Sequence, residues 1–214
     1  MSPESAIVPV SITEPDPSTL HTIAETLARG ELVGLPTDTL YGITARLDFP
    51  EALARLRTIK GLPADSPLLF LVNSPEMAED YWQSPLPERL KRLLEAFWPG
   101  PLTVIYRTTL HSPVAVHEGT LALRMPASQF LLALVGECGV PLASTSANSH
   151  GNPPAGCPHE AMEIFPREVD LWADGGVLLR GEPSTVFDAV RGEIIRFGRV
   201  AADDIWQVWR KGEQ

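Results

Sequence analysis

The sequence predicts an α/β (α+β) protein in which a mixed β-sheet is flanked by helices. Apolar runs of strand length are interspersed with segments of helical periodicity along the 214 residues, and residues 184–197 have the pattern of a hairpin. The chain is 44% hydrophobic, which is enough to bury one sizeable core. We therefore expect a single domain over residues 1–214, without internal repeats.

The first elements follow from proline, glycine and apolar spacing. Residues 1–17 are rich in proline and lack periodicity, so we expect a loose arm that adds an edge strand over residues 6–10. Apolar residues between positions 20 and 28 fall on one helical face, and Gly30 ends that helix. A short apolar strand over residues 31–35 then leads into a polar loop.

The middle of the chain predicts further helices around a central strand. Pro50 and Glu51 open a helix that Gly61 ends. Residues 67–72 are continuously apolar, which is typical of a strand buried on both faces. The remaining elements of this part are helices over residues 75–82 and 87–97 and a strand over residues 102–106.

The C-terminal half continues the mixture of strands and helices. A helix from Phe130 is ended by Gly139, and a turn around Arg191 and Gly192 joins the two hairpin strands. The predicted strands cover residues 120–125, 140–143, 169–173, 184–188 and 193–197. The other predicted helices cover residues 158–165 and the segment 201–214, centred on residues 205–210.

Composition excludes several classes of protein. The formal net charge of −10 argues against an extended nucleic-acid surface, so weak or no direct RNA binding is expected. No apolar run approaches the roughly 18–20 residues of a membrane span, and the N-terminus lacks a signal-peptide pattern. We expect a cytoplasmic protein without membrane contact. Cys138 and Cys157 have no zinc-ligand spacing around them, so no protein metal site is predicted.

Short polar side chains gather just past two predicted strands. Thr37, Asp38, Thr39 and Tyr41 follow the strand over residues 31–35, and residues 144–148 (STSAN) follow the strand over residues 140–143. Strand ends are where ligands usually bind in α/β sheets, and small hydroxyls and amides give directional hydrogen bonds. The alternative for both clusters is a polar turn that caps the next helix.

Cations occupy two notable places in the sequence. Arg57 and Lys60 share one face in the last turn of a helix, where they either bind an anion or respond to the helix dipole. Arg124 stands at the end of an apolar strand, where a cation is costly to desolvate without an anionic partner. Its partner is either an acidic residue or the carboxylate or phosphate of a ligand.

The common catalytic templates are missing from the chain. It has no GxxxxGK[ST], GxGxxG, GxSxG or HExxH motif, and its five His residues are scattered. What remains is a set of hydroxyls, amides and fixed cations near strand ends. Such a set binds a phosphorylated and carboxylated ligand and favours group transfer by positioning, without a covalent nucleophile.

Several short motifs follow one another along residues 20–200: PTDTLYG (36–42), IKGLPADSPL (59–68), FWPGPLT (97–103), LALRMPA (121–127), STSAN (144–148), PSTVFD (183–188) and IIRFG (194–198). Together they closely resemble the YrdC/Sua5 family of threonylcarbamoyl-AMP synthases, in its short single-domain form. The resemblance implies a YrdC/RibB-like fold, whose twisted mixed sheet lines a deep concave pocket. It also implies that L-threonine, bicarbonate or carbon dioxide, and ATP give threonylcarbamoyl-AMP and pyrophosphate. The product serves N6-threonylcarbamoylation of tRNA by other proteins.

The resemblance also assigns roles to individual residues. It implies that ATP is bound by Lys60, Thr120, Ser146, Asn148 and Arg196, and that Lys60 acts in catalysis. It implies that threonine is bound by Thr37, Tyr41, Arg124 and Ser184, with Arg124 on the threonine carboxylate. A magnesium ion is expected to accompany ATP, with no dedicated protein ligands.

Leu62 departs from the family pattern, because the second basic residue of the KxR motif is absent here. Losing a guanidinium that grips phosphate removes a charge-assisted bond worth roughly 1.5–3 kcal/mol. Arg57 either substitutes for it, or the protein is a nucleotide-binding paralogue with altered or lost activity. An RNA-binding or ribosome-maturation module is a further alternative.

Overall fold

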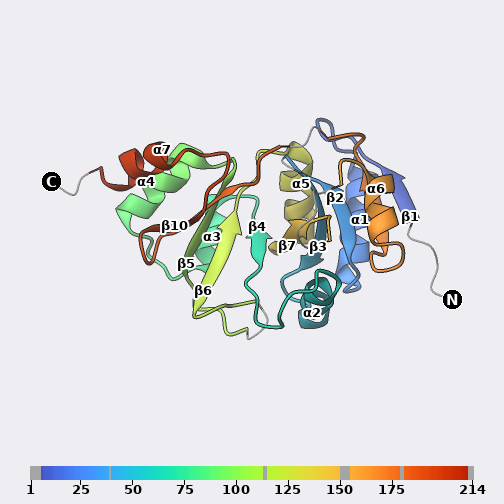
Figure 1. Cartoon of the computed structure of the whole chain (residues 1–214), viewed down its shortest axis with the longest axis horizontal. Helices are drawn as coiled ribbons and strands as arrows, with labels where there is room; N and C mark the ends of the chain where they lie inside the picture. The colour runs from blue at the N-terminus through green and yellow to red at the C-terminus, as the bar shows by residue number, and fades with distance from the viewer. Residues whose placement is uncertain (1–5, 39, 113–114, 150–154, 179–180, 212–214) are drawn as a thin grey trace.

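A computed structural model describes residues 6–38, 40–112, 115–149, 155–178 and 181–211. In this part of the chain, strands and helices form a mixed α/β structure with one continuous sheet. The two ends of the chain lie at opposite ends of the long axis (Figure 1). The mixed sheet flanked by helices that the sequence predicts is therefore confirmed.

Ten strands of the described residues form the sheet, in the order β1-β8-β2-β3-β7-β4-β6-β5-β9-β10. Parallel and antiparallel pairs are mixed, and the central strands β3, β7, β4 and β6 come from widely separated parts of the sequence. The strands are β1 (Ala6–Pro9), β2 (Val33–Pro36), β3 (Tyr41–Arg46), β4 (Leu69–Leu71), β5 (Leu102–Arg107), β6 (Thr120–Arg124), β7 (Leu142–Ser146), β8 (Leu171–Asp174), β9 (Thr185–Asp188) and β10 (Glu193–Arg196).

The helices begin and end where the sequence places polar caps, prolines and glycines. The Asp16 carboxylate accepts a hydrogen bond from the Thr19 amide at the start of α1, and Gly139 ends α5 with a positive φ of 67°. The helices are α1 (Pro17–Ala28), α2 (Pro50–Ile59), α3 (Pro75–Tyr81), α4 (Glu88–Phe97), α5 (Gln129–Cys138), α6 (Pro158–Ile164) and α7 (Ala202–Trp209).

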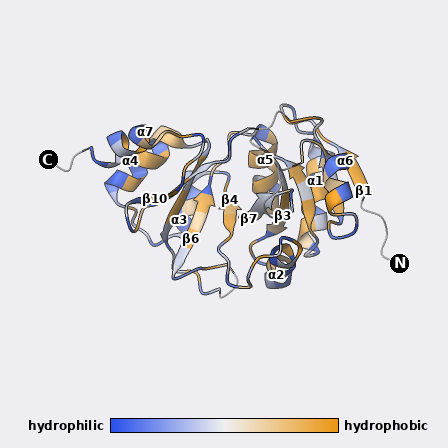
Figure 2. Cartoon of the chain, viewed as in Figure 1, coloured by the Kyte–Doolittle hydropathy of each residue, from blue (hydrophilic) through white to orange (hydrophobic). Residues whose placement is uncertain are grey.

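Alternation along the strands divides the buried residues between two apolar clusters. Phe70 belongs to one cluster and its neighbour Leu71 to the other, as do Ala143 and Leu142. The smaller cluster packs α1 and α5 on the sheet, and the larger one contains residues of α2, α4 and α7. Figure 2 shows the matching two-sided colouring of α4, apolar on one side and hydrophilic on the other. Helices therefore pack on both faces of the sheet.

One strand is absent from the sequence-based prediction. β3 directly follows the polar loop after β2. The sequence left two alternatives for this loop, a ligand site or a turn that caps a helix. It pairs with β2 and β7 and brings Gly42 opposite Ser146. The predicted loop over residues 35–42 is consequently a tight connection between two strands, and no helix follows it.

Parts of some predictions lie outside the described residues. These are residues 1–5 of the arm, Thr39 of the polar loop, and residues 212–214 of the closing segment.

Gly34 is a position where a side chain cannot fit. It lies opposite Trp172 in the pairing of β2 with β8, and a Cβ atom on Gly34 would lie 1.8 Å from Cε3 of the buried indole. We expect Gly34→Ala to lower the free energy of unfolding by about 1–3 kcal/mol, measured by urea denaturation.

Gly136→Ala in α5 is the matched control for this substitution. Its added Cβ would lie 3.2 Å from the Asn73 side chain, and alanine favours helix, so we expect a change within about 1 kcal/mol. Equal effects of the two substitutions would contradict the packing argument.

Candidate functional site

A cavity of about 400 Å³ lies against the central strands, where several polar strand ends meet. The described residues that line it come from β3 to β7, from β9 and β10, and from their adjoining loops. They include Thr37, Asp38, Tyr41, Leu62, Thr103, Arg124, Ser144, Thr145, Ser146, Ser184, Ile195 and Arg196. Its volume matches that of a small-molecule site. Residues predicted from distant motifs thus share one hollow.

Thr37 and Tyr41 line this cavity, but both hydroxyls already bind backbone. The Thr37 hydroxyl donates to the Leu40 carbonyl and accepts from the Leu40 amide at 2.9 Å, which closes the turn between β2 and β3. The Tyr41 hydroxyl donates to Gly176 O at 2.8 Å and accepts from Gly175 N at 3.0 Å. Burial raises the pKa of Tyr41 to about 12. Tyr41 therefore holds the segment after β8 against the site.

Arg124 lies at the end of β6 and is 4% exposed. Its Nη2 donates to Asp38 Oδ2 at 2.6 Å, and its Nε donates to Gly100 O at 3.0 Å. Burial lowers the pKa of Arg124, and the attraction of Asp38 opposes that shift. An acidic side chain thus offsets the cost of burying this cation, which is one of the two alternatives that the sequence left open.

Ser184 and Arg196 form a second polar group on the wall of the cavity. Arg196 Nη2 donates to Ser184 O at 2.8 Å and to Ser184 Oγ at 3.1 Å, while Thr103 Oγ1 lies 2.8 Å from Ser184 Oγ. The pairing of β10 with β9 slips between Ile194 and Arg196. Because of this bulge, the consecutive residues Ile195 and Arg196 both line the cavity, although strand neighbours normally point to opposite faces.

Lys60 does not line the cavity, but it contacts Ser146, which does. Its ammonium donates to Ser146 O at 2.6 Å, to Asn148 Oδ1 at 2.7 Å and to Asn148 O. Ser146 Oγ also donates to Asn148 Oδ1, at 2.6 Å, so the three predicted residues form one network. In this network only Ser146 lines the hollow. Lys60 joins the end of α2 to the end of β7.

Thr120 lies at the opposite end of β6 from Arg124, beside a second hollow of about 270 Å³. Its hydroxyl donates to His117 O at 2.7 Å. The two hollows adjoin each other, because both are lined by Pro67, Leu68, Ile105, Ala122 and Ile195. Of the residues assigned to ATP, Thr120 therefore lies beside the second hollow, whereas Ser146 and Arg196 line the first hollow together with the residues assigned to threonine.

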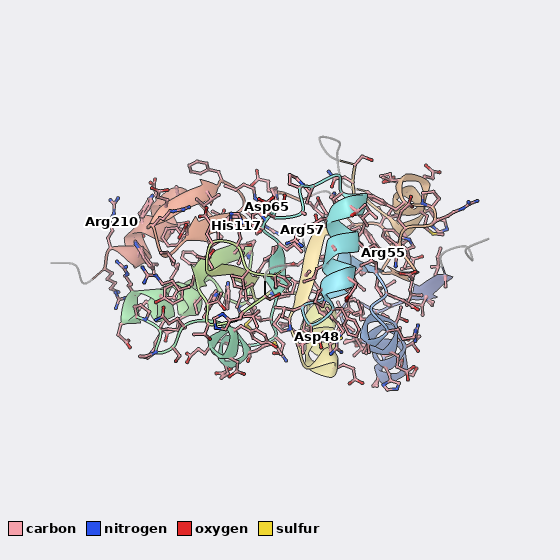
Figure 3. The ribbon with its side chains drawn as sticks, turned by 90° about the horizontal axis from the view of Figure 1, so that it is seen from below. Asp48, Arg55, Arg57, Asp65, His117 and Arg210 are labelled. Atoms are coloured by element: carbon pink, nitrogen blue, oxygen red, sulfur yellow. The ribbon has the colours of Figure 1, made fainter. Side chains whose placement is uncertain are left out.

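Leu62 lines the first cavity, whereas Arg57 is held elsewhere. The buried Arg57 side chain donates from Nε to Ser66 O at 2.8 Å. Figure 3 shows Arg57 on the side of α2 that faces Asp65 and His117, opposite Arg55. The position of the missing basic residue is thus an apolar part of the wall.

Asp38 and Thr103 belong to the site although the sequence-based assignment left them out. Asp38 stood in the recognised polar loop, so an acidic partner for Arg124 was available from the sequence. Thr103 is buried within β5 and meets Ser184 only through the parallel pairing of β5 with β9. No local pattern distinguishes it from any other threonine in a strand.

Within the described residues, no three His, Cys, Asp or Glu side chains gather as metal ligands. The same part of the chain has no helix with the length and apolar character needed to cross a membrane. Cys138 and Cys157 are both free thiols, and burial raises the pKa of Cys138 to about 11. The polar side chains that line the cavity are hydroxyls, the Asp38 carboxylate and the guanidinium groups of Arg124 and Arg196.

Burial lowers the pKa of Lys60 to about 8, from 10.5, which gives a pH-dependent stability. Between these two values the unfolded chain binds more protons than the folded protein, so stability rises with pH. We expect the unfolding free energy of the wild type, minus that of Lys60→Met, to rise by about 1–2 kcal/mol over this window. Urea denaturation from pH 7 to 10.5 measures it.

Lys91→Met is the control for this series, because Lys91 forms an exposed ion pair with Glu88 at 3.0 Å. Its difference from the wild type should stay nearly constant over the same window. A flat or falling difference for Lys60→Met would mean that folding does not lower the pKa of Lys60.

Comparison with known proteins finds a family model and relatives that match most of the chain. Residues 25–198 match the Sua5_yciO_yrdC family model, described as telomere recombination. The chain is 34% identical over 186 residues to a threonylcarbamoyl-AMP synthase of Pyrococcus abyssi, covering 85% of this chain and 54% of that protein. It is 36% identical over 167 residues to the enzyme of the same name from Bacillus subtilis, covering 76% and 48%.

A solved structure agrees with these matches. The structure of Pyrococcus abyssi Sua5 complexed with L-threonine superposes with a TM-score of 0.87 at 31% identity, covering 98% of this chain and 62% of that one. The chain spans about half the length of the two curated relatives. The matched residues include the motifs that build the cavity, and the chain belongs to the Sua5/YciO/YrdC family.

Proposed function

We propose that the protein is an L-threonylcarbamoyladenylate synthase, which forms threonylcarbamoyl-AMP and pyrophosphate from L-threonine, bicarbonate or carbon dioxide, and ATP. The observation that carries this proposal is the cavity in which Arg124, Ser184 and Arg196 meet the polar end of β7. Relatives named threonylcarbamoyl-AMP synthase, and the threonine complex of one structural neighbour, support the same activity.

Threonine would occupy the end of the cavity near the β2–β3 turn. Arg124 is a buried guanidinium suited to a carboxylate, because a planar fork of donors matches two carboxylate oxygens. Thr37, Tyr41 and Ser184 line the same cavity and would shape the space that threonine occupies.

ATP would extend along the cavity toward Thr120 and the second hollow. Arg196 and Ser146 line the first hollow where phosphates would pass, and Lys60 with Asn148 fixes the turn that carries Ser146. Magnesium would enter the site together with ATP, bound to its phosphate oxygens. When bound there, the ion would neutralise phosphate charge.

The chemistry needs no covalent nucleophile from the protein. The neutral threonine amine adds to carbon dioxide, forming an N–C bond and losing one proton to solvent. A carbamate oxygen then attacks the α-phosphorus, and the bond from that phosphorus to the bridging oxygen breaks as pyrophosphate leaves. Fixed guanidinium and hydroxyl groups stabilise charge during this transfer, because they are already oriented.

Pyrophosphate release is the direct test. Purified protein with ATP, magnesium, bicarbonate and labelled threonine should release pyrophosphate and form a labelled adenylate only when threonine and bicarbonate are both present. Arg196→Gln should lower this rate about 10–100-fold, because a charge-assisted contact to phosphate is lost. Arg29→Gln, which removes an exposed partner of Glu31, should leave the rate unchanged. No threonine-dependent product under any metal condition would reject the proposal.

Because Leu62 stands where the family has a basic residue, we expect the site to bind the phosphates of ATP more weakly. Leu62→Arg should increase ATP affinity up to about tenfold, because it returns a guanidinium to the cavity wall. Isothermal titration with ATP and magnesium measures this, and Leu62→Met is the control that keeps the wall apolar. No gain for Leu62→Arg would mean that another donor already serves that phosphate.

A further inference from the structure

The Arg124–Asp38 ion pair lies inside the cavity and is largely shielded from water. The side chains are 5% and 15% exposed, and Nη2 lies 2.6 Å from Oδ2. Both residues line the same hollow. A carboxylate from the protein itself therefore occupies the guanidinium that is otherwise best placed to receive a substrate carboxylate.

Asp38 is only half satisfied in this arrangement. Its Oδ2 accepts from Arg124 and, at 3.2 Å, from the Ala127 amide. Its Oδ1 is buried and accepts no hydrogen bond within the described part of the chain. A buried carboxylate oxygen without a donor is unfavourable, so Asp38 has unused capacity for a donor that enters the cavity.

The charges around Arg124 require that a carboxylate, either from Asp38 or from a ligand, pairs with it. Arg196 and Arg199 lie close enough to repel Arg124 electrostatically, and Asp38 is the acidic side chain that lines this cavity within the described residues. If Asp38 moved away without replacement, a buried guanidinium would lose its partner beside two other cations. Release of Asp38 is therefore favourable only when another anion takes its place.

We propose that Asp38 occupies the substrate-carboxylate position on Arg124 in the ligand-free protein, and that binding exchanges it for the carboxylate of an α-amino acid. This inference rests on the proposed function and deepens it. The displaced Asp38 accepts hydrogen bonds from the amine of the entering ligand, which supplies the donor that Oδ1 lacks. Asp38 thereby acts as a positioning and specificity-determining residue.

This exchange selects for ligands that carry both charges. A ligand with a carboxylate but no amine displaces Asp38 and leaves it buried without a donor. A ligand with an amine but no carboxylate cannot displace Asp38 from Arg124, so it does not bind to either residue. A zwitterionic amino acid satisfies both residues, because it replaces each half of the internal ion pair with its own charges.

Paired ligands that differ by one amine test the exchange. L-Threonine and 3-hydroxybutyrate differ only in the α-amino group, and isothermal titration measures both affinities in the wild type and in Asp38→Asn. We expect the preference for threonine to fall about tenfold in Asp38→Asn, while 3-hydroxybutyrate binds more tightly than it does to the wild type. Asp38→Glu keeps the charge and should retain most of the preference.

Asp48→Asn is the matched control, because Asp48 also pairs with an arginine, Arg46, at 2.8 Å, but outside the cavity. This variant should bind both ligands as the wild type does. Asp38→Ser removes the same charge and replaces Asp38→Asn if the latter does not fold. An unchanged threonine preference, or an equal loss of both ligands, would overturn the exchange.

The outcome separates this inference from the proposed function. Failure of the wild type to release pyrophosphate rejects the synthase activity, whereas tighter binding of 3-hydroxybutyrate to Asp38→Asn supports the exchange independently. If the wild type makes the adenylate but Asp38→Asn binds 3-hydroxybutyrate no better, the activity stands and the exchange is wrong.

Discussion

The structure of the site depends on a buried cation at the end of a central strand. Arg124 is placed by β6 among apolar neighbours, where desolvation is costly without an anion. The fold supplies that anion from the β2–β3 turn and a carbonyl from Gly100. Three chain segments are thereby held around one guanidinium, and the cavity forms where they meet. The need to neutralise this charge links the architecture of the sheet to its binding chemistry.

Hydrogen bonds near the ends of other strands hold the rest of the cavity. Lys60 ties α2 to the turn after β7, Arg196 binds Ser184 across the β9–β10 hairpin, and Tyr41 holds the backbone after β8. Each contact joins an element from one part of the chain to another. Polar groups that line the cavity are thus held by hydrogen bonds to other segments of the chain, which orients them for a ligand.

Much of the fold was predictable, because its signals are local. The spacing of apolar residues in α1, the prolines that open α2 and the glycine that ends α5 each act within a few residues. β3 was missed because it begins inside a loop whose polar residues suggested a turn. The site motifs were recognisable as a set, but the roles of Asp38 and Thr103 were not. Both contact residues far away in the sequence, and the spacing of residues along the chain does not predict such contacts.

The sequence by itself determined the fold class, most of the helices and strands, and which polar residues gather at strand ends, because capping and periodicity are properties of short segments. Only the tertiary structure decided which partners those residues take. Lys60 donates a hydrogen bond to Ser146, and Arg124 pairs with Asp38. The reason is that strand order in a mixed sheet brings together residues far apart in the chain. Burial then sets the electrostatic cost that each charge must offset.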